Sequence, residues 1–226
     1  MFIMISVLIP IYNGIEYIDE SVNSVLDQTY GEWQLIVGIN GHPPDSTVYK
    51  MAKQYEDLDP RIRVYDMPEV RGKGNALNKM LELCNYEWIA ILDVDDAWLP
   101  TKLEKQVPFM DRFDIVGTKC VYFEGLEGTV PKIPTGDISD FDFTTVNPVI
   151  NSSSLVKKAL AVKYGWDSDY DGVEDYKFWL TARKDGQKFY NVDEVLVRHR
   201  VHVSSAYNSK DNRELLQKLL GEILSR

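Results

Sequence analysis

Three aspartates within four residues, Asp93, Asp95 and Asp96, directly follow an apolar run. Carboxylate oxygens are the ligands that Mg²⁺ and Mn²⁺ prefer in proteins, so the cluster is a candidate site for a divalent cation. A lone aspartate would more often only cap the helix that Pro100 is expected to open. A calcium loop of the EF-hand type is excluded, because Trp98 stands where the sharp turn of that loop requires glycine.

Two other polar groups lie in the second half of the chain. Glu174 and Asp175 open a predicted helix, and the dipole of that helix would by itself favour carboxylates at this end. His202 follows a strand-like segment, where a histidine more often makes an ordinary polar contact than a metal bond. Neither group indicates a particular reaction by itself.

An aromatic residue and a basic loop lie in the first half of the chain. A metal ion and basic side chains together can hold a diphosphate, which makes Arg71 and Lys73 candidates for such contacts. Tyr12 could stack on a nucleobase. The alternatives are that the two basic residues form a solvated turn and that Tyr12 packs in the core.

The segments that must position these residues alternate between strands and helices. Apolar or β-branched runs predict strands, and residues with one apolar face predict the helices between them. Such alternation implies a parallel sheet with helices on both faces, and ligands bind such sheets at the carboxyl ends of the strands. The expected strands are 3–9, 33–39, 61–66 and 88–92, and the loops at their carboxyl ends are 10–14, 40–45, 67–75 and 93–98.

The clean alternation fades after residue 119, and the second half is expected to contain a mixed sheet. Its expected elements are a strand near 148–155, a helix over 174–184, strands over 189–192 and 195–200, and a last helix over 212–224.

Composition excludes several classes of protein. The 226 residues carry a net charge of −10 and no basic run, which argues against a nucleic-acid partner. Two cysteines cannot form a disulfide framework and fit a reducing compartment. The apolar first ten residues are too short to span a membrane. The P-loop pattern is absent, and the glycines near Lys73 do not form a dinucleotide fingerprint.

Five segments, taken in this order, resemble the family 2 glycosyltransferases, whose members have the GT-A fold. The resemblance covers roughly residues 3–207. The segments that carry it are Val7-Leu8-Ile9-Pro10-Ile11-Tyr12-Asn13, Ala76-Leu77-Asn78, Leu92-Asp93-Val94-Asp95-Asp96-Ala97-Trp98-Leu99-Pro100, Glu174-Asp175-Tyr176-Lys177-Phe178-Trp179-Leu180 and Arg200-Val201-His202-Val203-Ser204.

The resemblance implies an α/β fold of GT-A type. Its Rossmann-like, mostly parallel sheet would have helices on both faces and a smaller mixed-sheet half for the acceptor. The whole chain, 1–226, would form one domain. Within it we expect a nucleotide-sugar-binding half over 1–119, an acceptor half over 120–207 and a C-terminal helix over 208–226.

The resemblance also implies roles for individual residues. Asp175 would be the catalytic base, and Asp95 and His202 would bind the metal. Donor binding falls to six residues, Pro10, Ile11, Tyr12, Asn40, Lys73 and Asp93, and acceptor binding to three, Trp98, Glu174 and Trp179.

Two departures from the family pattern bear on the donor. Asn40 stands where the family usually has an aspartate that reads uracil, and an amide both donates and accepts, so another base could also pair with it. Leu77 replaces the basic residue that commonly precedes Asn78 in the family, so Lys73 or Arg71 must supply the positive charge for a phosphate.

The function that the resemblance implies is a metal-dependent, inverting glycosyltransferase with Mn²⁺ or Mg²⁺ as cofactor. It would move a sugar from a nucleotide-diphosphate sugar, with a UDP-sugar favoured, to a carbohydrate or lipid-linked acceptor in glycan or polysaccharide assembly. The alternatives are a non-catalytic nucleotide-sugar-binding module and a sugar-phosphate nucleotidyltransferase. The latter would need a Gly-rich signature near the first strand, which residues 10–14 do not supply.

The expected location is the cytoplasm, with peripheral contact at a membrane surface left open and no transmembrane segment. The last helix carries an apolar stripe that would pack on the core or form a homodimer. Single sugar addition is expected rather than polymerisation, because the membrane spans and the Gln-x-x-Arg-Trp motif of processive synthases are absent.

Overall fold

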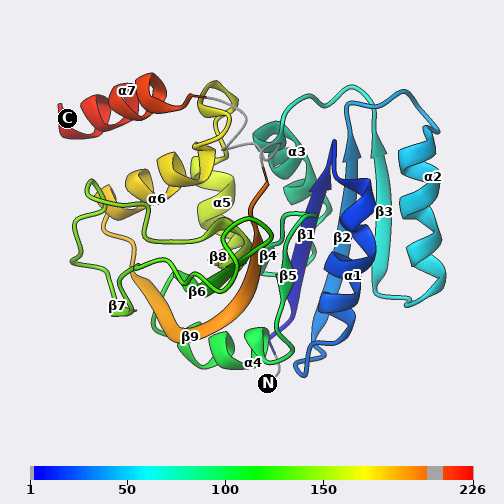
Figure 1. The fold of residues 1–226 in the computed structure, drawn as a ribbon, viewed down its shortest axis with the longest axis horizontal. Coiled ribbons are helices and arrows are strands. Elements are labelled where there is room, and N and C mark those ends of the chain that lie inside the picture. Colours follow the sequence, from blue (N-terminus) through cyan, green and yellow to red (C-terminus); the bar gives the residue numbers. More distant parts are fainter. Residues whose placement is uncertain (1–2, 203–210, 226) are drawn as a thin grey trace.

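The computed structural model describes residues 3–202 and 211–225, which contain one nine-stranded sheet flanked by helices (Figure 1). The strands follow one another across the sheet as β3-β2-β1-β4-β8-β6-β9-β5, and β7 pairs with β9. The strand bounds are β1 Ile5–Ile11, β2 Trp33–Asn40, β3 Ile62–Met67, β4 Trp88–Ile91, β5 Ala97–Trp98, β6 Ile115–Phe123, β7 Gly136–Asp137, β8 Leu155–Lys157 and β9 Phe189–Arg200.

The first half of the sheet is parallel, as the alternating pattern predicted. β1 lies between β2 and β4 and is buried along its whole length, which explains its continuous apolar sequence. Pro10 is tolerated inside β1, because β4 pairs with this strand only from Ile5 to Leu8 and no ladder partner needs the missing N–H. The carboxyl end of β1 is thereby left open beside β4.

Helices cover both faces of the sheet, and alternate residues of each strand pack under different helices. Ile9 lies in the cluster with α1, α2 and α4, whereas Leu8 lies in the cluster with α3, α5, α6 and α7. The two layers make this the α/β architecture that the sequence predicted. The helices are α1 Ile18–Leu26, α2 Thr47–Lys53, α3 Lys73–Met80, α4 Lys102–Gln106, α5 Lys158–Tyr164, α6 Glu174–Lys184 and α7 Arg213–Leu224, with short 3₁₀ turns η1 Ile15–Tyr17, η2 Gln54–Asp57, η3 Leu81–Leu83, η4 Val107–Phe109, η5 Asn151–Ser153 and η6 Ser168–Tyr170.

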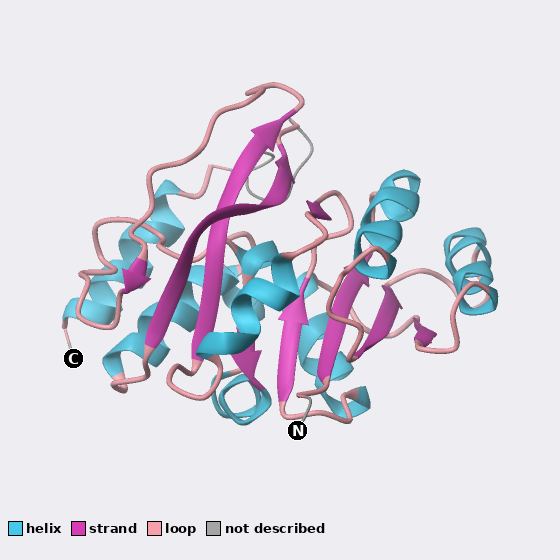
Figure 2. Cartoon of the chain, turned by 90° about the horizontal axis from the view of Figure 1, so that it is seen from below, coloured by secondary structure: helices cyan, strands magenta, loops and turns pink. Residues whose placement is uncertain are grey.

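The second half of the sheet is mixed, and two expected strands differ from the structure. The strand expected near 148–155 is wrong: Asn151–Ser153 forms a 3₁₀ turn and the strand begins at Leu155. The two strands expected over 189–192 and 195–200 are one 12-residue strand, β9, whose polar Asp193-Glu194 interruption falls where its register with β6 shifts. Such a shift bends and twists a strand without ending it. The sheet of Figure 2 contains long strands that bend along their length.

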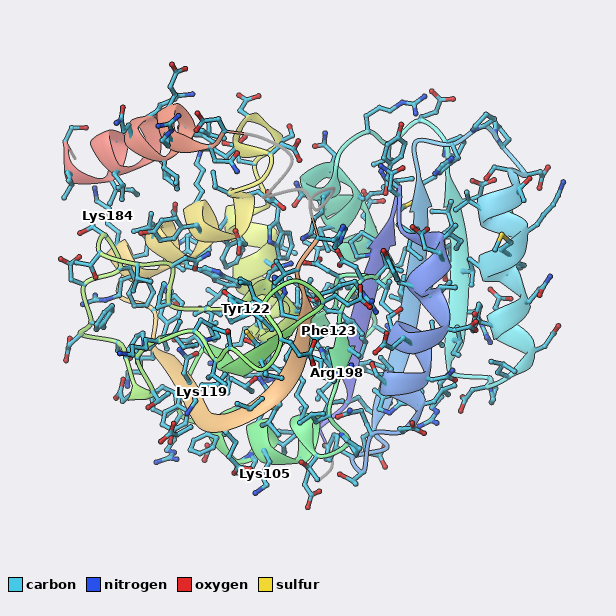
Figure 3. The ribbon with its side chains drawn as sticks, viewed as in Figure 1. Lys105, Lys119, Tyr122, Phe123, Lys184 and Arg198 are labelled. Carbon is cyan, nitrogen blue, oxygen red and sulfur yellow. The ribbon has the colours of Figure 1, made fainter. Side chains whose placement is uncertain are left out.

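The described C-terminal helix packs on α6. Lys184 near the end of α6 donates to the carbonyl of Ile223 in the last turn of α7 (Figure 3), where a positive charge also suits the helix dipole. The expected boundary at 207/208 and the motif residues Val203 and Ser204 lie outside the described residues. Within the described ranges, every helix is too short or too polar to cross a membrane.

Trp179, which was expected to contact the acceptor, lies in the core instead. Its side chain is 0% exposed and meets Phe178 and Phe189 edge to face. The reason is its position on α6. Trp179 follows Tyr176 by three residues and Asp175 by four, and at this point the helix faces the sheet. The prediction of an acceptor wall at Trp179 is therefore wrong.

This placement makes Trp179 a stability residue. We expect Trp179→Ala to lower the free energy of unfolding by about 3–5 kcal/mol, because it leaves a large cavity in a packed layer. Trp179→Phe should cost clearly less, since the indole N–H has no hydrogen-bond partner to lose within the part of the chain that the structure describes. Urea unfolding of both variants measures the difference, and equal losses would contradict a role based on ring packing.

Candidate functional site

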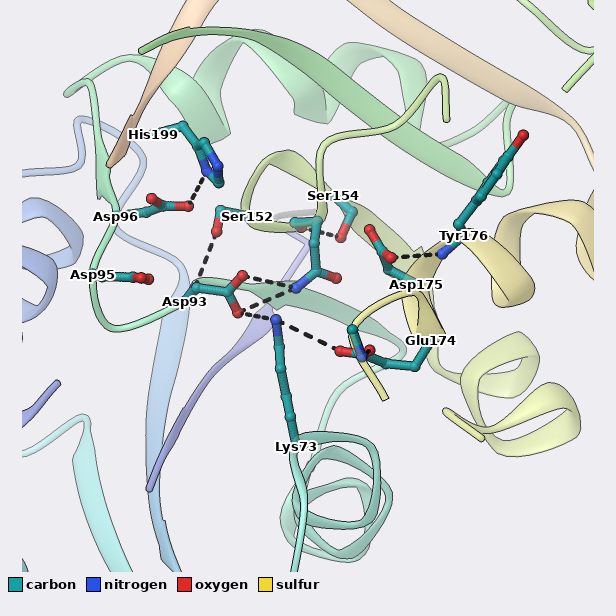
Figure 4. A network of polar contacts seen from close by, with 12 residues as sticks. Lys73, Asp93, Asp95, Asp96, Ser152, Ser154, Glu174, Asp175, Tyr176 and His199 are labelled. Carbon is teal, nitrogen blue, oxygen red and sulfur yellow. Dashed lines mark hydrogen bonds and ion pairs between the residues drawn. The ribbon is translucent and has the colours of Figure 1, made fainter. Parts of the chain in front are cut away.

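The loop after β4 carries Asp93, Asp95 and Asp96 and is called the D-x-D loop. It meets the start of α6, and Lys73 at the start of α3 joins the two. Lys73 Nζ lies 2.6 Å from Asp93 Oδ1 and 3.8 Å from Glu174 Oε1. Figure 4 shows Lys73 and Asp93 between Asp95 and Asp96 on one side and Glu174 and Asp175 on the other. Segments 80 residues apart in the chain are thereby brought into one polar network.

Asp93 is the most completely held of the three aspartates. Besides Lys73, the amide of Asn151 donates to its two carboxylate oxygens at 3.2 and 3.3 Å, and Ser152 Oγ accepts from its backbone N–H at 3.1 Å. Burial alone would raise the pKa of Asp93, but the charge of Lys73 and the hydrogen bonds outweigh it and hold the pKa below its ordinary value. Asp93 is thus a fixed anion with a fixed orientation.

Asp95 faces the histidine that the sequence assigned to the same site. Its Oδ2 lies 2.9 Å from His202 Nε2. Burial raises the pKa of Asp95, and the charges of Asp96 and Asp93 raise it further. Of the two aspartates of the D-x-D pattern, Asp95 is therefore the one whose negative charge is least compensated by the chain.

Asp96 orders the far side of the loop. It accepts from the backbone N–H of Arg200 at 2.9 Å and pairs with His199 Nδ1 at 2.9 Å. Burial alone would lower the pKa of His199, but Asp96 outweighs it and raises the pKa to about 9. At neutral pH this imidazole is therefore a cation, and it balances the buried carboxylate of Asp96.

Arg200 ties the same loop to β9. Its Nε donates to the carbonyl of Asp95 at 2.9 Å, and its guanidinium pairs with Glu20 of α1 and with Glu124 after β6. The guanidinium carbon also lies 4.3 Å from the ring centroid of Tyr17. This planar, multiply bonded cation holds the D-x-D loop against three other segments.

Asp175 lies in the first turn of α6 on the other side of Lys73. It accepts from the N–H of Tyr176 at 2.7 Å and from the amide of Asn147 at 3.2 Å. Burial and the neighbouring charge of Glu174 raise the pKa of Asp175 to about 6, against the opposing effects of Lys73 and these hydrogen bonds. A carboxyl group of this kind is ionised at neutral pH yet more basic than an ordinary aspartate, which suits a general base.

Glu174 is a structural partner in this arrangement. It is 5% exposed, and its carboxylate accepts from the N–H of Gly172 at 2.7 Å while facing Lys73. Its expected contact with an acceptor stays a prediction, since its oxygens already bind within the chain.

Tyr12 and its neighbour Asn13 are the exposed residues of the first loop, and Tyr12 is the aromatic one. It is 53% exposed, and its ring centroid lies 5.1 Å from that of His42. Gly41 lies beneath it, with φ +75°, and a Cβ there would lie 2.9 Å from Arg71 Nη1 and 3.2 Å from the Tyr12 ring. Glycine at this position lets the Tyr12 ring and the Arg71 guanidinium approach the backbone closely.

Three expected donor contacts lie deeper than the sequence suggested. Pro10 is buried, Ile11 is 0% exposed and Asn40 is 2% exposed. The side chain of Ile11 packs in the core cluster with α1, α2 and α4. The expected role of Pro10 and Ile11 in lining the nucleoside site stays a prediction. Asn40 ends β2 beside Gly41, and its pairing with a base stays a prediction.

Trp98 also requires a correction. It is 3% exposed, its indole N–H donates to the carbonyl of Ser152 at 2.7 Å, and Lys102 Nζ lies 3.9 Å from its ring centroid. The ring is covered because β5 pairs with β9 and turns Trp98 inward. Trp98 therefore supports the turn that holds Asp93 and forms no wall for a sugar.

The side chains at Asp95 can form one side of a divalent cation site. One carboxylate and one imidazole match the oxygen and nitrogen ligands that Mn²⁺ accepts. In residues 3–202 and 211–225 no group of three or more His, Cys, Asp or Glu side chains is arranged to hold a metal. An ion here would take its remaining ligands from water and from a substrate, as Mg²⁺ does in phosphate-binding sites.

The sequence analysis assigned no role to several residues that build this site, although Arg200 lies in one of the five motif segments. Asn147, Asn151 and Ser152 hold the carboxylates, and His199 and Arg200 hold the loop. The available signal was the polar run Asn151 to Ser154, which lies between apolar residues and is buried throughout. Buried polar side chains in such a run must find partners, and here some of those partners are at the site.

Comparisons with known proteins point to one family. Residues 6–161 match the family described as Glycosyl transferase family 2. The chain is 30% identical over 213 residues to the O-antigen biosynthesis glycosyltransferase WbnJ of Escherichia coli, covering 91% of this chain and 83% of WbnJ.

Two solved structures share the fold. S. aureus TarS 1-349 in complex with UDP-GlcNAc superimposes with a TM-score of 0.79 at 19% identity, over 98% of this chain and 66% of TarS 1-349. The mannosyltransferase PcManGT from Pyrobaculum calidifontis, in complex with GDP-Man and Mn²⁺, gives a TM-score of 0.74 at 17% identity, over 98% of this chain and 64% of that protein. The chain therefore spans about two thirds of the length of these two structures.

The network around Lys73 leads to a prediction about stability. We expect Lys73→Met to lower the free energy of unfolding at pH 8 by about 1–3 kcal/mol, because Asp93 and Glu174 lose their shared cation. Lys73→Arg, which keeps the charge, serves as the matched control.

The loss should depend on pH. Asp93 has a lowered pKa in the folded protein, so its stabilising effect is present above its ordinary pKa and disappears as the pH falls through the lowered value. Without Lys73 the carboxylate can take up a proton at a higher pH, so the loss in Lys73→Met should be smaller at pH 4.5 than at pH 8. Urea unfolding at the two pH values tests this, and an equal loss at both would contradict it.

Proposed function

The chain belongs to glycosyl transferase family 2 and is a glycosyltransferase; we propose that it moves a sugar from a nucleotide-diphosphate sugar to an acceptor hydroxyl, with inversion at the anomeric carbon. The observation that carries this proposal is the Lys73 bridge, which joins Asp93 of the D-x-D loop to Glu174, the residue next to Asp175. Such a transfer needs residues that bind the sugar donor and a group that accepts the proton of the acceptor hydroxyl.

Asp175 would act as the general base. The acceptor oxygen attacks the anomeric carbon from the face opposite the diphosphate, and Asp175 takes the proton of that hydroxyl as the bond forms. With a pKa of about 6, Asp175 is mostly ionised at pH 7 and ready to accept the proton. No covalent bond between sugar and protein is required.

Asp95 and His202 would hold a divalent cation, with Mn²⁺ or Mg²⁺ as the candidates. Such an ion acts as a Lewis acid and neutralises charge that develops on a departing diphosphate. The Mn²⁺ in the structure of PcManGT supports this part of the proposal. Asp93, held by Lys73 and Asn151, would orient the donor beside it.

The nucleoside would lie at Tyr12, where the exposed ring can stack on a base and Arg71 lies close by. We favour a UDP-sugar, in line with the UDP-GlcNAc complex of TarS, although PcManGT was solved with GDP-Man. The acceptor would be a carbohydrate or a lipid-linked glycan in surface polysaccharide assembly, which is the kind of pathway that the name of WbnJ states. Two buried thiols without a disulfide fit action on the cytoplasmic side of the membrane.

A panel of UDP-, GDP- and dTDP-sugars tests the proposal. Each is incubated with the protein and Mn²⁺ or Mg²⁺, and both the release of nucleoside diphosphate and the shift of the melting temperature are recorded. One donor should stabilise the fold by mass action and also be consumed. Stabilisation without consumption, with and without candidate glycan acceptors, would instead indicate the non-catalytic binding module.

Asp175→Asn should lower turnover of that donor by about 10²–10⁴, the usual contribution of a general base. Binding of UDP with Mn²⁺, measured by calorimetry, should stay nearly the same, because the change removes proton transfer and not a donor contact. Asp169→Asn is a matched control on the exposed turn η6. Full activity of Asp175→Asn would refute the assignment of the base.

Asp95→Ala should have the opposite profile. It should weaken the Mn²⁺-dependent part of UDP binding about tenfold or more, because a single carboxylate ligand is removed from a site with few protein ligands. Binding measured in EDTA should hardly change. An equal affinity for UDP with Mn²⁺ in the variant and in the unaltered protein would exclude Asp95 as a metal ligand.

A further inference from the structure

One five-residue stretch reaches both sides of the site. Asn147 Nδ2 lies 3.2 Å from Asp175 Oδ2, and Asn151 Nδ2 lies 3.2 Å from Asp93 Oδ1 and 3.3 Å from its Oδ2. Asp93 follows β4 and Asp175 opens α6, so the two carboxylates belong to different parts of the fold. The stretch from Asn147 to Asn151 is a direct covalent connection between the groups that hold them.

The stretch is itself fixed between its two asparagines. The carbonyl of Pro148 accepts from Asn191 Nδ2 at 2.8 Å, and the carbonyl of Ile150 accepts from Ser153 Oγ at 2.8 Å. Asn191 is 0% exposed, as is Ser153, so both anchors belong to the packed interior. A segment held at both carbonyls keeps a constant spacing between its end residues.

Asn151 is poorly explained as a residue that only stabilises the fold. It is 8% exposed, and its Oδ1 is buried with no hydrogen-bond partner among the described residues. A buried carbonyl without a donor is unfavourable, so an apolar residue would suit a purely structural position better. The amide is explained by its Nδ2 group, which donates to both carboxylate oxygens of Asp93.

We propose, on the basis of the function proposed above, that Asn147 and Asn151 are positioning residues for glycosyl transfer and that the stretch between them sets the placement of Asp175 relative to Asp93. Asn147 acts through the base and Asn151 acts through the donor-binding carboxylate. The two asparagines therefore affect different steps, although they are only four positions apart.

The effect of Asn147 follows from the bonds of Asp175. The N–H of Tyr176 occupies Oδ1, and the amide of Asn147 occupies one lone pair of Oδ2. Each oxygen of Asp175 therefore keeps one lone pair that could accept the proton of an acceptor hydroxyl. The amide also favours the ionised carboxylate, as any donor to a negative oxygen does.

The effect of Asn151 follows from the bonds of Asp93. Lys73 reaches Asp93 Oδ1 from the α3 side, and the amide of Asn151 reaches both oxygens from η5. Without the amide, the carboxylate can rotate about its bond toward Lys73. A rotated Asp93 would bind the donor less well, but the proton transfer at Asp175 would be unaffected.

Four single variants test the proposal. Asn147→Asp and Asn151→Asp keep the size of the side chain, replace its N–H donor by an oxygen and add a negative charge, whereas Asn147→Ala removes the whole amide without adding a charge. Thr145→Ala is the matched control, because Thr145 is exposed in the same loop and, among residues 3–202 and 211–225, its hydroxyl bonds only to the carbonyl of Asp142. Melting curves establish that each variant is folded at the assay temperature.

The measurements are the pH profile of donor turnover from pH 5 to 9 and the affinity for UDP with Mn²⁺. In both Asn147 variants we expect the midpoint of the acidic limb, where kcat falls at low pH, to move up by about one pH unit. The shift should be larger in Asn147→Asp. The affinity for UDP should not change in either variant. In Asn151→Asp we expect UDP affinity to fall about tenfold while the acidic limb stays in place. Thr145→Ala should match the unaltered protein in both readings.

Three outcomes would overturn the proposal. The first is that the variants of Asn147 and Asn151 match Thr145→Ala. The second is that these variants lose activity only in proportion to their lost stability, while the acidic limb of the kcat profile and the affinity for UDP stay the same. The third is that both positions change the same reading, which would contradict separate roles. If the unaltered protein turns over no donor of the panel, the failure lies with the proposed function and not with the positioning.

Discussion

The shared cation of Lys73 is the interaction on which the site depends. Five carboxylates, those of Asp93, Asp95, Asp96, Glu174 and Asp175, converge at the carboxyl edge of the sheet. Two like charges 4 Å apart repel by about 4 kcal/mol at the effective dielectric of a protein surface, so this arrangement requires positive charge within it. Lys73 supplies that charge between the two groups, and the charge of the two acids in turn raises the pKa of Lys73 against the effect of burial. The bridge therefore fixes the distance between Asp93 and Glu174, the residue next to Asp175.

The rest of the network follows from the same requirement. His199 balances Asp96, and Arg200 binds the carbonyl of Asp95 while pairing with Glu20 and Glu124. These contacts join β9 to a loop about one hundred residues earlier, so the mixed half of the sheet holds the site that the parallel half begins. Such a division explains why the family match can end at residue 161 while basic and acidic groups beyond it complete the site.

Much of the fold could be predicted because its signals are local. β1 reads as a continuous apolar run because it is covered on both faces, and α6 begins at Glu174 as its pattern predicted. The errors arose where tertiary contacts decide. The family resemblance implied sugar contacts for Trp98 and Trp179, yet pairing of β5 with β9 and the inward face of α6 bury them. The asparagines that donate to Asp93 and Asp175 lie 28 to 58 positions away in the sequence, and no local pattern identifies such partners.

The electrostatics of the aspartate cluster also decide which of its members suits a cation. Lys73 and Asn151 compensate Asp93, whose pKa is lowered, and His199 compensates Asp96. Asp95 has a raised pKa, because burial and the charges of its two neighbours disfavour its ionised form. A divalent cation gains most where negative charge is least compensated, and it would relieve the repulsion that raises the pKa of Asp95. By the same argument, Asp93 would gain less from a cation, because Lys73 and Asn151 already compensate its charge.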